Sequence, residues 1–315
     1  MSHVRPLALQ LCPFSPYLEA ELAKRFEVVR WFDLAAAARA TLLHDRAQAV
    51  QAVVTGGHLG CPVDLMQGLP HLGVIAVNGV GLDKVDLPLA RQRGIAVGNT
   101  PGVLTEDVAD LAVGLIIALL RGIPAGDAHV KSGAWVNGDR PLGRKVSGRR
   151  FGIVGMGRIG VAIAQRLAPF GPVAYTGPRE KAVPYVFHAD IHALARAVDV
   201  LVLACPADAA TYRLANASVL EALGGQGYLV NVSRGSVVDE AALIAALEAG
   251  RLAGAALDVF ENEPRVPEAL LKRANTVLTP HVASATVETR TRMADIVLAH
   301  LDAFLLGLPL PAGPG

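Results

Sequence analysis

The stretch Phe151-Gly152-Ile153-Val154-Gly155-Met156-Gly157-Arg158-Ile159-Gly160 decides the fold. Its first four residues carry no charge and predict a buried strand, and a helix is expected over residues 159–167. The three glycines have the spacing GxGxxG. In such a turn the first glycine permits the tight bend, the second lets a pyrophosphate approach the backbone, and the third allows the helix to pack closely on the strand. The helix N-terminus also attracts the anion, so the stretch predicts a dinucleotide-binding βαβ unit.

The rest of the chain alternates short apolar runs with longer helical patterns, which is typical of βαβ units and a parallel sheet. Helices are expected between the strands, for example at 17–26 and at 240–249, where Gly250 is expected at the C-terminal end. The expected strands are 7–11, 52–55, 74–77 and 95–97, followed by 151–154, 173–175, 200–204, 228–232, 255–259 and 276–278.

A break at Thr100-Pro101-Gly102 separates the first strands from a helix that Thr105 is expected to cap and that runs to residue 120. A last helix, residues 287–306, follows the final strand and is free to pack on the first region. We therefore expect an α/β protein of two Rossmann-like domains with doubly wound parallel sheets. A flavodoxin-like substrate domain (residues 1–100, completed by the C-terminal helix 286–315) would contain an inserted dinucleotide-binding Rossmann domain (residues 101–285).

The charge balance excludes several classes of protein. Of 315 residues, 29 are basic and 28 acidic, so the formal net charge is +1, and no basic stripe for a nucleic acid is visible. With 52% hydrophobic and only 18% charged residues, a disordered chain is equally excluded. The longest apolar run, residues 111–120, is shorter than the roughly 20 residues that a bilayer requires. The first residues contain no signal-peptide core, so we expect a cytoplasmic protein without a membrane or nucleic acid as partner.

The cysteines indicate a reducing environment and no metal centre. Cys12, Cys61 and Cys205 are odd in number and widely spaced. No CxxC pattern or His/Cys cluster accompanies them, so we expect three small, reduced core residues and no metal site.

The strand after the glycines bears on the choice of dinucleotide. NAD-binding proteins usually carry an acidic residue at the tip of this strand, about 20 residues on, to hold the ribose 2′-hydroxyl. The strand is expected to end at Tyr175, and its tip reads Thr176-Gly177-Pro178-Arg179, without a carboxylate. Arg179 can pair with a 2′-phosphate, whereas Glu180 is a rival by its spacing from the glycines. We expect NADP(H) as the preferred cofactor and NAD(H) as the alternative.

Three later strands end in polar residues, and open α/β sheets bind ligands at the carboxyl ends of their strands. Arg234 follows one of these strands, and its planar guanidinium suits a carboxylate or carbonyl group. Residues 258–264 supply acids, among them Glu263, and His281 follows the last strand. An arginine, a carboxylate and a histidine together supply a substrate anchor, an acid–base group and a residue that orients it.

Six segments of the chain match one known family. They are Gly79-Val80-Gly81-Leu82-Asp83, residues 100–105, the glycine stretch at 155–160, Ser233-Arg234-Gly235, residues 258–264 and Pro280-His281-Val282-Ala283-Ser284. Together they resemble the D-isomer-specific 2-hydroxyacid dehydrogenase family over nearly the whole chain. Within that family the chain is most similar to the glyoxylate/hydroxypyruvate reductases and the hydroxyphenylpyruvate reductases, through residues 12–26 and 254–267.

The resemblance implies a role for each of the three polar residues. Arg234 would bind the carboxylate and keto oxygen of the substrate, His281 would be the general acid that protonates the carbonyl, and Glu263 would hold the histidine. A nearby carboxylate favours the charged imidazolium and so keeps a proton available. A glutamate here also argues against the formate dehydrogenase branch, in which the histidine pairs with glutamine.

The resemblance also implies the other contacts. The backbone amides of Val80 and Gly81, helped by Gly57, would bind the substrate carboxylate. Asp258 and Ser284 would lie on the carboxamide side of the nicotinamide. Cys205-Pro206 would line the adenine side. The expected cofactor contacts are Thr105, Gly155, Met156, Gly157, Arg158, Ile159, Gly160, Thr176, Gly177, Pro178, Arg179, Cys205, Pro206, Val232, Ser233, Asp258, His281 and Ser284.

A tryptophan in the loop before the glycine stretch bears on the oligomeric state. Trp135 stands two residues after Gly133. In reductases that resemble this chain, a tryptophan here reaches the active site of the partner subunit, which implies a homodimer. The alternative is an aromatic residue packed within its own loop.

The sequence thus predicts an enzyme that reduces a small 2-keto acid to the D-2-hydroxy acid with NADPH. Glyoxylate and hydroxypyruvate are the first candidate substrates. Phe14, Tyr17 and Leu82 leave open a larger substrate such as hydroxyphenylpyruvate or 2-ketogluconate. A second alternative is a dinucleotide-sensing binding protein, because some relatives of the family act as transcriptional corepressors.

Overall fold

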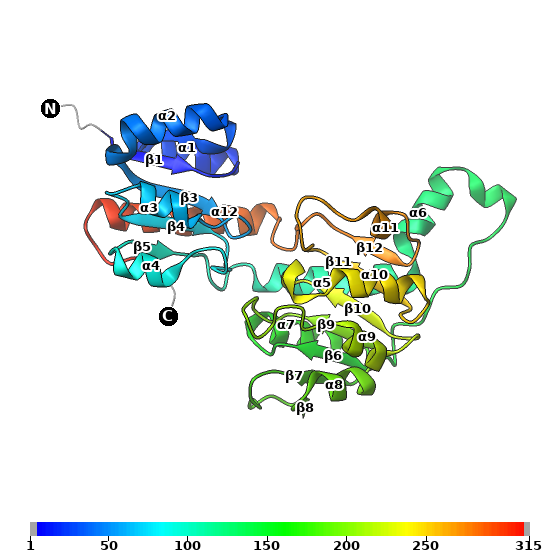
Figure 1. The fold of residues 1–315 in the computed structure, drawn as a ribbon. Coiled ribbons are helices and arrows are strands. Elements are labelled where there is room, and N and C mark those ends of the chain that lie inside the picture. Colours follow the sequence, from blue (N-terminus) through cyan, green and yellow to red (C-terminus); the bar gives the residue numbers. More distant parts are fainter. Residues whose placement is uncertain (1–4, 312–315) are drawn as a thin grey trace. The chain divides into compact units, whose positions relative to one another are not determined.

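The computed structural model describes residues 5–311, which form two compact units (Figure 1). One unit comprises the chain up to Val103 together with the segment from Ala285 onward, and the other comprises Leu104–Ser284. We call them the discontinuous unit and the continuous unit. Each contains one parallel sheet with helices on both faces, so the α/β class and the two Rossmann-like sheets are confirmed.

The discontinuous unit is built on a five-stranded sheet in the order β2-β1-β3-β4-β5. Alternate residues of each strand face opposite sides, as the strand pleat requires. Leu18 and Leu22 of α1 and Val297 of α12 cover one face, and Leu65 and Met66 of α3 cover the other. The elements are β1 (Leu7–Gln10), α1 (Pro16–Arg25), β2 (Glu27–Arg30), η1 (Trp31–Asp33), α2 (Ala36–Arg46), η2 (Ala47–Ala49), β3 (Val50–Gly56), α3 (Val63–Gly68), β4 (Val74–Asn78), α4 (Leu87–Gln92), β5 (Ala96–Gly98) and α12 (Val287–Leu305).

The continuous unit is built on a seven-stranded parallel sheet in the order β12-β11-β10-β9-β6-β7-β8. Leu194 of α8, Leu220 of α9 and Leu243 of α10 pack in one buried cluster on this sheet, while α5 packs against α7 and three of the strands. The elements are α5 (Thr105–Arg121), α6 (Ile123–Lys131), η3 (Ala134–Asn137), β6 (Phe151–Val154), α7 (Arg158–Leu167), β7 (Val173–Thr176), β8 (Val186–His188), α8 (Ile191–Ala197), β9 (Val200–Leu203), α9 (Ala217–Leu223), β10 (Tyr228–Asn231), η4 (Gly235–Val237), α10 (Glu240–Glu248), β11 (Gly254–Leu257), α11 (Glu268–Leu271) and β12 (Thr276–Leu278).

Two strands were not predicted, and both lie at a sheet edge. β2 has charged residues at both ends and is partly exposed, so it lacks the apolar run that marks a buried strand. β8 is only three residues long and is also partly exposed. The predicted cap by Thr105 is wrong: Thr105 is the first residue of α5, and the preceding Leu104 occupies the cap position without a side-chain hydrogen bond. Gly250 has φ of +63° directly after α10, as a glycine at a helix end should.

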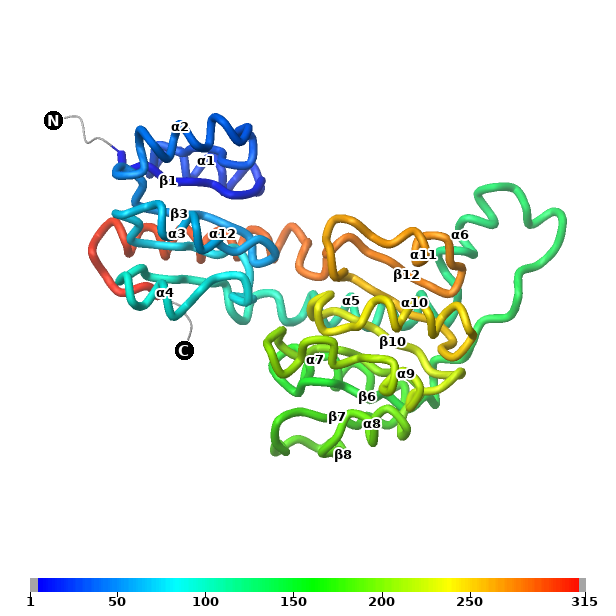
Figure 2. Tube along the Cα trace, in the orientation of Figure 1, coloured from blue at the N-terminus to red at the C-terminus, as the bar shows by residue number. Residues whose placement is uncertain are grey.

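One segment projects from the continuous unit. The tube in Figure 2 shows α6, η3 and the following loop extending away from the seven-stranded sheet. Within residues 5–311 no single helix is long and apolar enough to cross a membrane, and the only adjoining pair that would qualify by length, α5 with α6, is bent by 61°.

Candidate active site

The glycine stretch forms a turn between β6 and α7, and each of its three glycines is required for a different reason. Gly155 has φ of +95°, and a Cβ on it would lie 2.6 Å from the Cα of Cys205. A Cβ on Gly160 would lie 2.0 Å from the carbonyl oxygen of Gly155, so only glycine lets α7 pack this closely. A Cβ on Gly157 would meet no atom within 4 Å. This open space beside the N-terminus of α7 lets a pyrophosphate approach the backbone, so the residues present fit a dinucleotide.

The tip of β7 presents two charged side chains. Tyr175 is fully buried, and its hydroxyl accepts a hydrogen bond of 2.8 Å from the N–H of Lys181, which anchors the turn after the strand. Arg179 and Glu180 lie on this turn with exposed side chains. Both charges therefore face solvent at the place where the adenosine ribose of a dinucleotide is expected.

Arg234 lies on a turn after β10 that a buried asparagine organises. Asn231 is fully buried, and its Oδ1 accepts hydrogen bonds from the N–H and the hydroxyl of Ser233, at 3.0 and 2.9 Å. Its Nδ2 donates to the carbonyl oxygen of Arg234 at 2.9 Å. A Cβ on the next residue, Gly235, would lie 1.9 Å from the carbonyl carbon of Phe260. The glycine thus lets the arginine turn press against the loop that carries Glu263.

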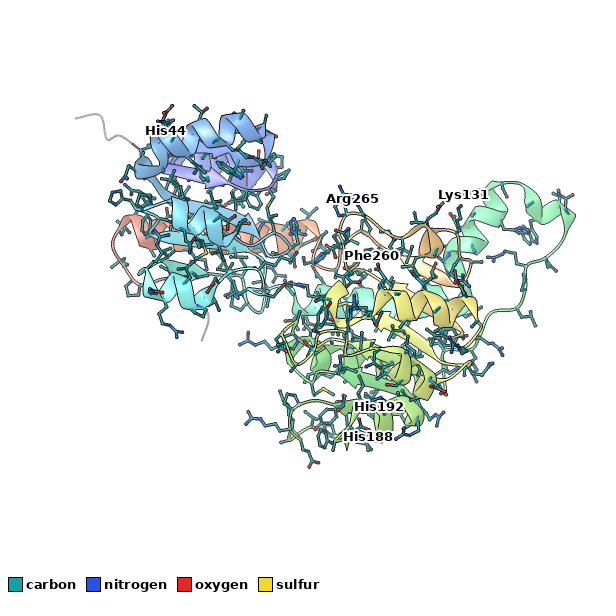
Figure 3. The ribbon with its side chains drawn as sticks, viewed as in Figure 1. His44, Lys131, His188, His192, Phe260 and Arg265 are labelled. Atoms are coloured by element: carbon teal, nitrogen blue, oxygen red, sulfur yellow. The ribbon has the colours of Figure 1, made fainter. Side chains whose placement is uncertain are left out.

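Glu263 and His281 form a hydrogen-bonded pair. The Nδ1 atom of His281 lies 2.8 Å from Oε2 of Glu263, while Oε1 of the same carboxylate accepts a 3.0 Å hydrogen bond from the N–H of Phe260. Phe260 and Arg265, which stand on either side of Glu263 in the sequence, are labelled in Figure 3 on the loop that follows β11. Both oxygens of the carboxylate are therefore fixed, and with them the plane of the imidazole ring.

The charge of Glu263 is stabilised by its neighbours. Burial by itself would raise the pKa of this carboxyl group, but the hydrogen bond and charge of His281, the N–H of Phe260 and the charge of Arg234 hold the pKa below its usual value. The structure therefore brings Arg234, Glu263 and His281 together in the continuous unit, where the glutamate is ionised at neutral pH.

A buried aspartate holds the loop of His281. Asp258 is fully buried, and its Oδ1 accepts hydrogen bonds from the Thr279 hydroxyl at 2.6 Å and from the N–H of Val282 at 2.9 Å. Its Oδ2 accepts from the N–H of Ala283 at 2.9 Å. His281 itself has φ of +53°, a conformation that costs energy for a residue other than glycine. The aspartate thus holds the histidine in a strained backbone conformation.

An apolar cavity adjoins the pair on one side. It has a volume of about 210 Å³ and lies between the loop after β11, α11 and the end of β12. Its walls are Phe260, Glu263, Pro264, Val266, Leu271, Leu278, Thr279, Pro280 and His281. Apolar walls lower the local dielectric constant, so the charge of Glu263 interacts more strongly with its hydrogen-bond partners than it would in water.

The other expected contacts occupy varied environments. Met156, Val232 and Ser233 are buried, Thr105 and Ile159 are half-buried, and Arg158 and Pro206 are exposed. In the discontinuous unit Gly57 and Gly79 face each other, since a Cβ on Gly79 would lie 3.0 Å from the Cα of Gly57. Val80 and Gly81 follow on the same loop and are half-buried. Ser284 is half-buried at the end of the histidine loop.

Comparison with known proteins identifies the family. The family profile described as D-isomer specific 2-hydroxyacid dehydrogenase, NAD binding domain, matches residues 113–283. A hydroxyphenylpyruvate reductase from Plectranthus scutellarioides is 47% identical over 304 residues, which are 96% of this chain and 96% of that protein. The chain belongs to the D-isomer specific 2-hydroxyacid dehydrogenases. A 2-ketogluconate reductase from Gluconobacter oxydans is 44% identical over 302 residues, 95% of this chain and 96% of its own.

The fold of this D-2-hydroxyacid dehydrogenase also matches solved structures. An NADPH-dependent glyoxylate/hydroxypyruvate reductase from Sinorhizobium meliloti, solved with NADP and malonate, is similar with a TM-score of 0.92 and 42% identity, over 99% of this chain and 97% of the other. The protein is therefore an enzyme that interconverts 2-keto acids and 2-hydroxy acids and binds a nicotinamide dinucleotide. The expected family membership and enzyme class are confirmed.

The cysteines of the dehydrogenase are core residues, as predicted. Cys12, Cys61 and Cys205 are all buried and free. Burial raises the pKa of these thiols to about 11, about 12 and about 11, respectively. No group of three metal-ligating side chains is present in residues 5–311.

Trp135 lies in the projecting segment of the dehydrogenase. Its side chain is 59% exposed and its Nε1 donates to Asp139 at 3.0 Å. The ring is therefore largely exposed, while its N–H is held by a residue of the same loop. Other exposed apolar residues of this segment are Ile123, Val130, Val136 and Leu142.

Sequence reasoning overlooked two side chains that position the site. The sequence analysis assigns no role to Asn231 or Thr279, yet each makes hydrogen bonds that hold a reacting loop. The signal for Asn231 is an amide side chain at the end of an otherwise apolar buried strand, because such a group needs partners in the adjoining loop.

Proposed function

We propose that the enzyme reduces a small 2-keto acid, with glyoxylate and hydroxypyruvate as first candidates, to the D-2-hydroxy acid with NADPH. The observation that carries the proposal is the 2.8 Å hydrogen bond between Nδ1 of His281 and Glu263, beside Arg234. Because Nδ1 donates to the carboxylate, Nε2 is the ring atom that can give a proton to the carbonyl oxygen.

The residues divide the work as follows. The guanidinium of Arg234 binds the carboxylate and the keto oxygen of the substrate, and its charge polarises the carbonyl. Glu263 stabilises the imidazolium form of His281, which protonates the oxygen. The amides of Val80 and Gly81, with Gly57 beside them, bind the substrate carboxylate. A bound nicotinamide dinucleotide supplies the hydride.

The preference for NADPH rests on the turn after β7. Arg179 is exposed there and can pair with a 2′-phosphate, and the strand tip itself carries no carboxylate. The similar Sinorhizobium reductase is described as NADPH-dependent, which supports the same preference. The alternative cofactor is NADH, whose ribose 2′-hydroxyl would have Glu180 as its partner. Faster turnover with NADH than with NADPH would refute the preference.

The substrate is tested with a panel of keto acids. Glyoxylate, hydroxypyruvate, hydroxyphenylpyruvate and 2-ketogluconate are offered with NADPH, and oxidation of the cofactor is followed by its absorbance. The relatives from Plectranthus and Gluconobacter make the two larger acids the second candidates. If NADPH binds and no keto acid is turned over, a dinucleotide-sensing binding protein becomes the better explanation.

We also propose a homodimer in which the projecting segment contacts the partner subunit. The exposed apolar residues on this segment, among them Trp135 and Leu142, at 59% and 98% exposure, support it. Light scattering tests it, and a monomer at all concentrations would exclude it.

A further inference from the structure

The loop after β4 presents two main-chain N–H groups that have no acceptor. Among residues 5–311 neither the N–H of Val80 nor that of Gly81 makes a hydrogen bond, although both residues are half-buried. Half-buried N–H groups without partners are uncommon in folded proteins, so this pair is available to a ligand. Successive N–H groups in a turn form a concave donor site for anions.

The carbonyl oxygens of the same two peptide groups both accept hydrogen bonds from residues 99 and 100. The Nδ2 atom of Asn99 donates to the carbonyl oxygen of Val80 at 2.9 Å. The N–H of Thr100 donates to the carbonyl oxygen of Gly79 at 2.9 Å. In a trans peptide the C=O and N–H bonds point in opposite directions. Both free N–H groups must therefore point away from residues 99 and 100.

Asn99 is itself fixed by the last helix. His300 of α12 is fully buried, and its Nε2 donates to the carbonyl oxygen of Asn99 at 2.9 Å. A Cβ on the preceding Gly98 would lie 2.6 Å from the imidazole ring, so the glycine is what lets His300 come this close. Asn99 is only 7% exposed and Thr100 is fully buried.

We propose that Asn99 is a positioning residue for substrate binding: its amide locks the Val80–Gly81 peptide so that the N–H of Gly81 faces the carboxylate of the 2-keto acid. Without this hydrogen bond the peptide can rotate and turn its carbonyl oxygen toward the anion, which replaces attraction by repulsion. The inference rests on the proposed binding of the carboxylate by Val80 and Gly81.

The test compares Asn99→Ala with a chemically matched control, Asn275→Ala. The Nδ2 atom of Asn275 also donates a hydrogen bond to a main-chain carbonyl oxygen, that of Ala253, at 3.2 Å. This pair lies in the continuous unit, where β11 and β12 begin. We measure KM and kcat for glyoxylate and hydroxypyruvate, the dissociation constant of oxamate as an inert keto-acid analogue, that of NADPH, and the unfolding temperature.

Asn99→Ala is expected to raise KM and the oxamate dissociation constant by about 10-fold or more, as the loss of a hydrogen bond to a charged group implies. NADPH affinity should stay close to wild type, because the glycine turn belongs to the other unit. Asn275→Ala should leave both carboxylate constants unchanged, even if it lowers the unfolding temperature equally. Asn99→Ser, whose hydroxyl is too short to reach Val80, gives a second variant if the alanine variant does not fold.

Two results separate this inference from the proposed reaction. If the wild type reduces keto acids and Asn99→Ala binds oxamate as tightly as the wild type, the positioning role is overturned and the reaction stands. If no keto acid is reduced, the reaction is overturned. Oxamate binding to the wild type that weakens in Asn99→Ala would then still support the anion site.

Discussion

Replacing Glu263 with glutamine isolates the effect of its charge on His281. Glutamine has nearly the same size and can still accept the hydrogen bond from Nδ1, but it carries no charge. The carboxylate lies 2.8 Å from Nδ1, and the two side chains are 26% and 29% exposed. The substitution therefore removes a negative charge in a largely enclosed place and leaves the shape of the site intact.

The size of the effect follows from this geometry. A hydrogen bond to a charged group contributes about 1.5–3 kcal/mol and one between neutral groups about 0.5–1.5 kcal/mol, so exchanging the first for the second costs about 1–1.5 kcal/mol. A loss of this size in the step that transfers the proton lowers the rate by a factor of about 5–10. In the wild type, burial would raise the pKa of Glu263, but its hydrogen bonds and neighbouring charges hold the pKa below its usual value. The carboxylate therefore stays ionised through the neutral range.

The expected result is a changed pH profile. For Glu263→Gln the kcat/KM of keto-acid reduction at neutral pH, where Glu263 of the wild type is ionised, should fall about 5–10-fold. As the pH falls through the lowered pKa of Glu263, the wild-type carboxyl group loses its charge as well, so the two enzymes should converge.

The control is Glu261→Gln in the same loop. Glu261 forms an ion pair of 2.9 Å with Arg213 instead, so its variant loses a charge from the loop without touching the histidine. Its pH profile should overlay that of the wild type. A Glu263→Gln profile that falls equally at every pH, or does not change, would refute the reasoning.

Three further predictions concern the glycine turn, an ion pair and the histidine loop. The Cβ of Gly157→Ala enters only open space, so this variant should keep its melting temperature. The same space is expected to hold the pyrophosphate, so NADPH binding should weaken about tenfold or more in a fluorescence titration. Gly160→Ala should instead lower the melting temperature, because its Cβ would lie 2.0 Å from a carbonyl oxygen. Burial alone would raise the pKa of Asp199, but the hydrogen bonds and charge of Arg150 together with the charge of Arg149 lower it. The stabilisation is thus present above the usual carboxyl pKa and is lost as the pH falls through the lowered pKa. Asp199→Asn should cost about 1 kcal/mol in urea unfolding at neutral pH and little in acid, and an equal cost at both would contradict this. Thr279→Val leaves a buried carboxylate short of one donor, so kcat should fall severalfold with NADPH affinity retained; unchanged kcat would show that the loop does not need the hydroxyl.

Much of the fold was predictable because parallel strands buried on both faces read as continuous apolar runs. The six predicted strands of the continuous unit all exist, with ends displaced by no more than two residues. The edge strands β2 and β8 were not predicted because a strand at a sheet edge does not require an apolar run. Thr105 was misplaced as a cap because a threonine before two acids fits either side of a helix start.

The reacting side chains were easier to predict than the groups that hold them. Arg234 and His281 follow strands, so the sheet itself brings them to one edge. The contact of Gly235 with Phe260 joins two loops whose proximity no local pattern encodes. The left-handed conformation of His281 likewise depends on a tertiary clamp rather than on its own residue type.

The same arrangement recurs at three strand ends, and each time it holds a loop of the proposed site. Asn231 ends β10 and holds the arginine turn, Asp258 follows β11 and holds the histidine loop, and Asn99 follows β5 and holds the Val80 peptide. In each case a buried polar side chain satisfies main-chain groups of the loop. A parallel sheet delivers the loops to one edge but does not fix their peptide planes, so this second layer of hydrogen bonds must do so. Removing any of the three should therefore impair the reaction through misplaced partners, while every reacting group remains in the chain.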